Sequence, residues 1–167
     1  MRALRGGCAF LASGLFLSHG MYRLTKFTQW KFLRGCGIVG TIEAMLTWWF
    51  MPQFSKGVAV TLVVLATLAS VAIAHQAERY YDNEDDPRIV IDEYVGFLFT
   101  CLMIPKTLGA LIVGALIFRV FDVWKPFGIA KIEEIPDGWG CIFDDVASGI
   151  IAGAIVALVG FVLKAFF

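Results

Sequence analysis

The residues of this sequence that are best suited to chemistry are its carboxylates, which are concentrated in two stretches. Of 14 acidic residues, 13 lie between residues 75 and 93 or between residues 119 and 145. Five stand at the edges of apolar runs, where a charge is costly unless a cation balances it: Asp92, Glu93, Asp122, Asp144 and Asp145. Carboxylates that converge favour a shared divalent cation, and ligands made only of oxygen suit Mg²⁺. Such an ion polarises a phosphoryl group and activates a water molecule.

The other loop acids have a simpler interpretation, because loops of membrane proteins are charged where they meet water. We predict a solvated role for five of them: Glu84, Asp85, Asp86, Glu133 and Glu134. Helix capping is a structural alternative for Asp92 and Asp144, since the helix dipole favours an N-terminal carboxylate by about 0.3–1 kcal/mol.

Two cationic side chains stand close to Asp122. Arg119 and Asp122 are three residues apart and therefore share a helix face, and Lys125 precedes Pro126, which ends the helix. An arginine binds a phosphate through two hydrogen bonds and a lysine neutralises it as a point charge. Snorkelling to the lipid headgroups is the structural alternative for both. His75, at the end of an apolar run, is either a proton donor to a leaving alkoxide or a structural histidine facing the headgroups.

The elements that must position these residues are apolar helices. The chain is 59% hydrophobic with a mean hydropathy of +0.76, whereas soluble domains are about 45–50% apolar. A helix needs roughly 20 apolar residues to cross a bilayer. Candidate segments are 38–54, 58–74, 95–104, 107–121 and 146–167, and small residues in the last (Gly149, Gly153, Gly160) suit close helix packing. We predict an all-α integral membrane protein, a polytopic bundle of about four to five membrane helices.

The N-terminal segment has features of a signal peptide, but it lacks a clear cleavage site and a basic stretch, 23–34, follows it. We therefore expect an uncleaved interfacial or short membrane helix. Six of the 14 basic residues lie between residues 2 and 34, which predicts that this end and both acidic loops face the cytoplasm. Residues 1–167 are predicted to form one domain, with 1–36 as a divergent segment and 37–167 as the core. Zero net charge and the lack of a basic-aromatic stripe argue against a nucleic-acid partner.

Four strings carry a resemblance to a known family: HQAERYY, DPRIVIDEYVGF, ALIFRVFDVWKPFGI and GWGCIFDDVASGIIAG. In this order, over about residues 57–160, they resemble the phosphatidylglycerophosphatase A family. The resemblance implies Mg²⁺-dependent hydrolysis of phosphatidylglycerophosphate to phosphatidylglycerol and phosphate at the bacterial inner membrane. It places the family's motif acids on Asp92, Glu93, Asp122, Asp144 and Asp145, and its basic and polar motif positions on His75, Gln76, Arg119 and Lys125.

The N-terminal part departs from the family pattern. Family members commonly carry a Pro-Gly-Thr-x-Gly-Ser loop near the first span, whereas residues 39–44 read VGTIEA and keep only the first glycine and Thr41. We keep Thr41 as a candidate for phosphate binding. Glu43 replaces a small residue at membrane depth, where we expect it to pair with a cation such as Arg34 rather than to bind a metal.

These observations predict a membrane-embedded lipid phosphatase, with the lipid substrate and the surrounding membrane lipid as its partners. Glu93, Asp144 and Asp145 are the predicted metal ligands; Asp92, Asp122 and His75 are the predicted catalytic residues; and Arg119, Lys125, Gln76 and Thr41 are predicted to bind the substrate phosphate. The attacking group is either a metal-activated water or an aspartate that forms an aspartyl-phosphate. The sequence does not determine the oligomeric state.

Two other classes of protein fit the sequence less well. A small cation transporter would carry acids in mid-span at pseudo-symmetric positions, yet only Glu43 lies mid-span. A structural membrane subunit has no need of paired acids beside helix starts.

Overall fold

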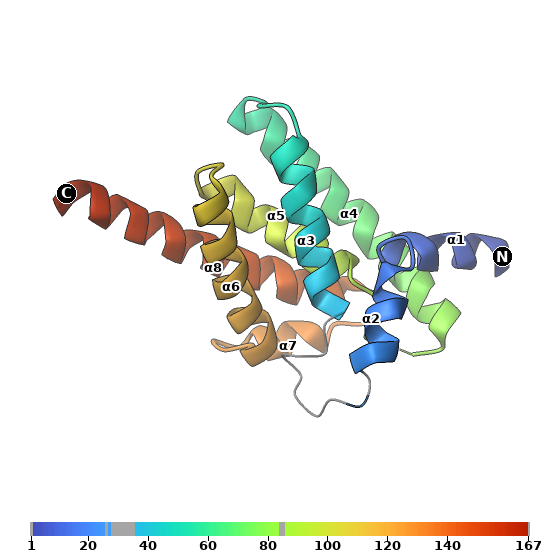
Figure 1. The fold of residues 1–167 in the computed structure, drawn as a ribbon. Helices are drawn as coiled ribbons and strands as arrows, with labels where there is room; N and C mark the ends of the chain where they lie inside the picture. Colours follow the sequence, from blue (N-terminus) through green and yellow to red (C-terminus); the bar gives the residue numbers. More distant parts are fainter. Residues whose placement is uncertain (1, 26, 28–35, 84–85, 167) are drawn as a thin grey trace.

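A computed structural model describes residues 2–25, 27, 36–83 and 86–166, and in these residues the chain is helical with no strand (Figure 1). The all-α prediction is confirmed. The helices of the described residues are α1 (Arg2–Ala12), α2 (Leu17–Thr25), α3 (Cys36–Phe50), α4 (Lys56–Tyr81), α5 (Ile91–Met103), α6 (Leu108–Trp124), α7 (Ile129–Glu133) and α8 (Trp139–Phe166).

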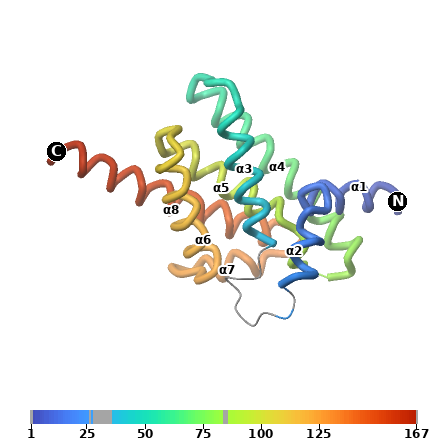
Figure 2. The backbone as a smooth tube through the Cα atoms, viewed as in Figure 1, coloured from blue at the N-terminus to red at the C-terminus, as the bar shows by residue number. Residues whose placement is uncertain are grey.

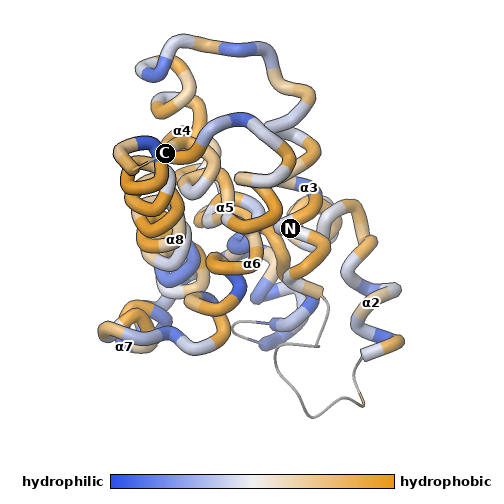
Figure 3. Tube along the Cα trace, turned by 60° about the vertical axis from the view of Figure 1, so that its left-hand side comes forward, coloured by the Kyte–Doolittle hydropathy of each residue, from blue (hydrophilic) through white to orange (hydrophobic). Residues whose placement is uncertain are grey.

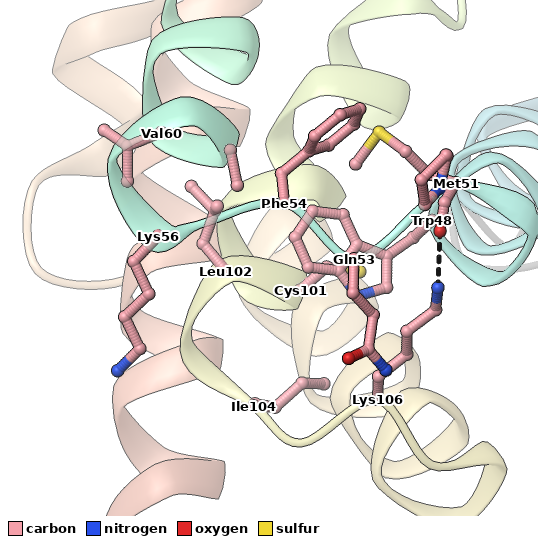
Figure 4. A pocket seen from close by; sticks show the side chains of 12 residues that line it. Trp48, Met51, Gln53, Phe54, Lys56, Val60, Cys101, Leu102, Ile104 and Lys106 are labelled. Atoms are coloured by element: carbon pink, nitrogen blue, oxygen red, sulfur yellow. Dashed lines mark hydrogen bonds between the residues drawn. The ribbon is translucent and has the colours of Figure 1, made fainter.

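Two short turns, here called the hairpin turns, reverse the chain between predicted apolar segments, one between α3 and α4 and one between α5 and α6. The turn between α3 and α4 contains Pro52, and the Ser55 side chain caps α4 by accepting a hydrogen bond from the Val58 amide at 3.5 Å. The turn between α5 and α6 ends at Thr107, which caps α6 in the same way. The Nζ of Lys106 donates to the Met51 carbonyl at 2.7 Å, and this bond joins the two turns beside a mainly apolar cavity of about 330 Å³ (Figure 4).

The helix bounds differ from the predicted segments in two places that affect the site. Helix α4 continues to Tyr81, so His75 lies within the helix instead of following it. Helix α8 begins at Trp139, so Asp144 and Asp145 lie in its second turn and do not precede it. Counting consecutive apolar residues underestimates the length of both helices, because the count stops at the first polar residues. A helix continues through such residues when they face a polar cavity.

Helix α5 occupies the centre of the bundle and packs against α3, α4, α6 and α8 (Figure 1). Helix α5 can approach α8 closely because Gly149 has no side chain; a Cβ there would collide with the Gly96 carbonyl. The Thr100 hydroxyl also donates a hydrogen bond to the Gly149 carbonyl at 2.9 Å. Gly153 is similarly packed against Met103, whereas a Cβ at Gly160 would meet open space. The predicted packing role therefore holds for two of the three glycines of α8.

The N-terminal segment forms two short helices where one was expected. Helix α1 packs along α4, and α2 packs against α3. The turn between α1 and α2 includes Gly14 at a φ of +56°, a conformation that glycine adopts without strain. The Val90 amide donates to the Ala12 carbonyl at 2.8 Å, which ties this segment to the loop before α5.

Helices α4 and α8 are long and apolar enough to cross a membrane, by length and composition. The C-terminal half of α8 extends beyond the other helices (Figure 2), and its Leu158 and Phe161 are 64% and 72% exposed. Figure 3 shows hydrophobic residues along the length of α8. Apolar surface of this extent is unfavourable in water, so these helices indicate a membrane protein.

Candidate metal and phosphate site

The five motif acids predicted from the sequence line one cavity, together with both predicted cations. The cavity has a volume of about 440 Å³ and lies at the end of the bundle away from the two hairpin turns. Its walls come from the start of α3, the loop before α5, the first turn of α5, the last turn of α6, helix α7 and the second turn of α8. Segments distant in the sequence are thus brought together by the way α5 packs against its neighbours.

Three carboxylates form the centre of this cavity. Asp92, Glu93 and Asp145 each offer an oxygen, and these atoms all lie within 4.8 Å of one another. Asp145 is 2% exposed and Asp92 is 8% exposed. The Cys141 thiol donates to Oδ2 of Asp92 at 3.3 Å, which holds that carboxylate against α8. Buried like charges at this separation repel one another strongly unless a cation is shared among them.

Arg119 connects two of the motif acids. Its Nη1 lies 3.3 Å from Oε1 of Glu93, and the same nitrogen contacts Oδ2 of Asp122 one turn further along α6. The guanidinium is buried, and this pairing offsets the cost of burying its charge. The predicted shared face of Arg119 and Asp122 is therefore present in the structure.

Lys125 binds the remaining motif acid. Its Nζ lies 2.6 Å from Oδ2 of Asp144 and 2.8 Å from Oε1 of Glu133 on α7. Burial lowers the pKa of Lys125, but the Asp144 and Glu133 carboxylates outweigh burial and hold the pKa well above its usual value. Lys125 therefore lines the cavity as a positively charged side chain at neutral pH. Glu133, which was predicted to be solvated, is partly exposed and also binds Lys125.

Asp86 is a site residue that the sequence analysis missed. It was predicted to be solvated, yet it is 6% exposed and lines the acidic cavity. Arg88 donates to both of its oxygens, from Nε at 2.6 Å and from Nη2 at 2.8 Å. Burial raises the pKa of Asp86, but these hydrogen bonds outweigh burial and leave the pKa below its ordinary value. The signal in the sequence is the Asp-Pro-Arg string, whose spacing lets the arginine fold back onto the aspartate.

Three of the predicted site residues lie elsewhere. His75 borders a separate cavity, where its Nδ1 is 3.4 Å from Asp137. The Thr41 hydroxyl donates to the Gly37 carbonyl within α3, and Gln76 is half-buried on α4; neither lines the acidic cavity. Their predicted roles are untested. The Glu43 carboxylate lies against Gly14 in the turn between α1 and α2, and its predicted partner Arg34 lies outside the described residues.

The donor set of the cavity fits a hard divalent cation. Of the described residues, seven carboxylates and two cationic side chains line it. Each cation already contacts two acids, and the carboxylates of the lining outnumber the cations, so the cavity has an excess of negative charge. Oxygen ligands of this kind suit Mg²⁺, which binds through a few carboxylates and keeps coordination positions for water and phosphate oxygens.

Comparison with known proteins agrees with the motif strings. The family described as phosphatidylglycerophosphatase A matches residues 24–160. A Bacteroides thetaiotaomicron protein named "Putative phosphatidylinositol-3-phosphatase" is 32% identical over 135 residues, which cover 76% of this chain and 84% of the relative. The phosphatidylglycerophosphatase A of Escherichia coli is 28% identical over 126 residues, which cover 74% of this chain and 73% of the relative. The Haemophilus influenzae protein of the same name is 38% identical over 74 residues, 43% of this chain and 45% of the relative.

No solved structure matches the chain. The family match, by contrast, includes every segment that lines the acidic cavity, from Cys36 in α3 to Asp145 in α8. The chain therefore belongs to the phosphatidylglycerophosphatase A family.

Proposed function

We propose that this protein hydrolyses the terminal phosphate monoester of phosphatidylglycerophosphate, releasing phosphatidylglycerol and phosphate, in a Mg²⁺-dependent reaction. The observation that carries the proposal is the group Asp92, Glu93 and Asp145, which shares one cavity with Arg119 and Lys125 in a chain of this family.

Asp92, Glu93 and Asp145 are the proposed metal ligands. This set differs from the sequence prediction by including Asp92 in place of Asp144, because the oxygens of Asp92, Glu93 and Asp145 lie within 4.8 Å of one another. When bound, the cation polarises the phosphoryl group and supplies positive charge to the transition state. Glu93 contacts both the proposed metal position and Arg119, so it aligns the arginine with the bound phosphate.

Arg119 and Lys125 are the proposed phosphate-binding residues. Each is held by carboxylates on either side, which fixes its position before the substrate arrives. Such preorganised cations stabilise the charge that develops on the phosphoryl oxygens during transfer. Asp122 acts as a positioning residue through Arg119. The attacking group is a water molecule or one of the buried aspartates. A phosphoryl-enzyme that survives acid quenching with radiolabelled substrate but is cleaved by hydroxylamine, as an acyl phosphate is, would identify an aspartate.

The proposed setting is the bacterial inner membrane, with the acidic cavity at its cytoplasmic surface and about four to five helices in the bilayer. Helices α3, α5 and α6 run beside α4 and α8 and have exposed apolar side chains, such as Leu46 and Leu116. At 1.5 Å per residue, the 13 residues of α5 extend about 20 Å, less than the roughly 30 Å of a hydrocarbon core. A shorter helix at the centre lets the cavity lie at headgroup depth, where a lipid phosphate resides.

The decisive experiment is phosphate release from phosphatidylglycerophosphate in mixed micelles, with Mg²⁺ and with chelator. We expect turnover with Mg²⁺ and none with chelator, and the D145N variant should lose activity. E134Q is the matched control, because Glu134 is exposed and lies outside the cavity lining. Mg²⁺-independent turnover would refute the metal assignment, and full activity in D145N would refute the site.

The substrate requires its own test, because a relative that is 32% identical is named for a phosphoinositide phosphatase. Phosphatidylinositol 3-phosphate and phosphatidylglycerophosphate both present a phosphate monoester on a lipid headgroup. We expect kcat/KM to be higher for phosphatidylglycerophosphate. A higher kcat/KM for the phosphoinositide would reassign the substrate while leaving the proposed chemistry in place.

A further inference from the structure

A cavity with a basic lining lies near the N-terminal segment, on the other side of the loop before α5 from the acidic cavity. It has a volume of about 700 Å³ and is bounded by α1, α2, the last turn of α4 and the loop before α5. Four arginines line it, accompanied by one histidine and two tyrosines: Arg2, Arg5, Arg79, Arg88, His19, Tyr80 and Tyr81. Among the residues that the structure describes, none that lines this cavity is a carboxylate. We call it the basic cleft.

The positive charge of the basic cleft is only partly balanced by the protein. Arg88 is paired with Asp86 and lies 4.0 Å from the centre of the Tyr81 ring. For Arg2, Arg5 and Arg79, the described residues offer no carboxylate within ion-pair distance. Arg79 also borders a separate cavity that is lined by Glu78 and Asp82. Arg2 and Arg5 are therefore the arginines of the basic cleft whose charge is least balanced by nearby carboxylates. Arginines that gather without acids are typical of sites for phosphate groups.

A smaller adjoining cavity extends the basic cleft. It shares His19 and Tyr80 with the cleft and adds Arg23 and Phe16. Burial lowers the pKa of His19, and the Arg88 guanidinium lowers it further, while the nearby Asp86 carboxylate offsets only part of this effect. Burial is the largest cause of this lowered pKa, and the Arg23 guanidinium adds to the effect of Arg88. Arginine side chains line both cavities, since Arg23 lies in the smaller one and four arginines lie in the basic cleft.

The two helices that supply Arg2, Arg5 and His19 also carry exposed apolar side chains. Leu4 is 66% exposed, Leu17 is 59% exposed and Leu24 is 77% exposed. Short helices with arginines beside exposed leucines suit the interface between lipid headgroups and acyl chains. The arginines of the cleft suit a phosphate, and the exposed leucines of the same two helices suit an acyl chain. Free inorganic phosphate would use only the first of these features.

We propose that the basic cleft binds the phosphate headgroup of an anionic phospholipid, at a site separate from the acidic cavity. The two sites adjoin through one ion pair, since Arg88 lines the cleft while Asp86 lines the acidic cavity. The segment that supplies Arg2, Arg5 and His19 precedes residue 24, where the family match begins. The proposal therefore concerns a feature of this chain's own N-terminal segment, and it does not rest on the proposed phosphatase activity.

The two histidines of the chain make the test direct. His19 lines the cleft and His75 lies in another cavity, so the ring signals of histidine-labelled protein in a neutral detergent report on the cleft and on a reference position. The signals are assigned with the H75Q variant. The protein is titrated with short-chain phosphatidylglycerol, with short-chain phosphatidylcholine and with inorganic phosphate, all in chelator so that no metal holds a phosphate in the acidic cavity.

We expect phosphatidylglycerol to move the His19 signal and leave the His75 signal in place, and phosphatidylcholine to move neither. In an R2Q/R5Q variant the concentration needed should rise about thirtyfold, which corresponds to the loss of two arginines near an anionic lipid. The matched control is K56Q/K164Q, which removes the same charge at the far end of α4 and near the end of α8, and it should titrate like the unchanged protein. The single variant R2Q, at an exposed residue, keeps the test available if the double variant does not fold.

Inorganic phosphate that moves His19 at the same concentration as phosphatidylglycerol would overturn the lipid assignment and identify a free-anion site. An unchanged His19 signal with every ligand would overturn the site, as would identical titrations of R2Q/R5Q and K56Q/K164Q. None of these results depends on turnover, so failure of this proposal is distinguishable from failure of the phosphatase proposal.

Discussion

The Nζ of Lys125 lies 2.6 Å from Oδ2 of Asp144, and this contact joins the end of α6 to the second turn of α8. The next residue, Asp145, belongs instead to the group with Asp92 and Glu93. Adjacent residues on a helix point about 100° apart. The two neighbouring aspartates therefore have different partners, one a lysine and the other a set of carboxylates.

This division predicts opposite effects on stability when no metal is bound. D144N leaves Lys125 with Glu133 as its acidic partner, and breaking a buried pair costs about 3–5 kcal/mol, an upper bound here because Glu133 remains. D145N removes one of several crowded carboxylates, so it should be neutral or stabilising in chelator. Thermal unfolding in detergent with chelator measures both. Equal destabilisation by the two variants would contradict the division of roles.

Metal binding predicts a further difference in stability. A cation that binds only the folded state at one hundred times its Kd stabilises it by about 2.7 kcal/mol. Mg²⁺ should therefore raise the Tm of the unchanged protein and of E134Q. The same addition should have little effect on E93Q, which lacks a central carboxylate. A full Mg²⁺-dependent rise in the Tm of E93Q would place the metal elsewhere.

The R119K variant tests whether the arginine acts through its shape or only through its charge. Lysine keeps the charge but lacks the planar fork that contacts Glu93, Asp122 and a phosphate together. We expect kcat/KM to fall about a hundredfold, in the range observed when one transition-state donor is lost. The Tm in chelator should change much less than kcat/KM. Unchanged kcat/KM would exclude a bidentate role for Arg119.

Asp86 predicts a pH dependence of stability. Its pKa is lower in the folded protein than in the unfolded chain because Arg88 binds the carboxylate. The stabilisation is therefore complete above the unfolded pKa of about 3.9 and is lost as the pH falls through the lower folded value. D86N should thus be less stable than the unchanged protein near neutral pH, and the two should converge in acid. Unfolding curves at several pH values measure this, and a difference that persists in strong acid would exclude the ion pair as its source.

The packing of α5 on α8 is tested by two glycine substitutions in the same helix. G149A places a methyl group against the Gly96 carbonyl, and overpacking of this kind costs about 1–3 kcal/mol. G160A meets open space and should be neutral or stabilising by up to about 1 kcal/mol, since alanine is the better helix former. The Tm in detergent reports both. A destabilised G160A would show that this half of α8 has a partner.

The sequence by itself determined the helical class, the two hairpins and the positions of the motif acids. The hairpin turns are specified by nearby residues. Pro52 and Pro105 interrupt the apolar runs, and Ser55 and Thr107 cap the helices that follow. Motif acids are visible because a charge beside a long apolar run is exceptional. The family was recognisable from the order of the motif strings, and its match begins at residue 24, ahead of the first of them.

Only the tertiary structure decided which of these residues meet. Periodicity places Asp144 and Asp145 on α8 but does not say how α8 is rotated against α5 and α6, and that rotation pairs Asp144 with Lys125 and Asp145 with Asp92. Burial of Asp86 depends on Arg88 folding back onto it, and the separation of His75 from the acidic cavity depends on the face of α4 that carries it. These contacts join residues whose neighbours are set by helix packing, and local sequence patterns carry no information about packing between distant segments.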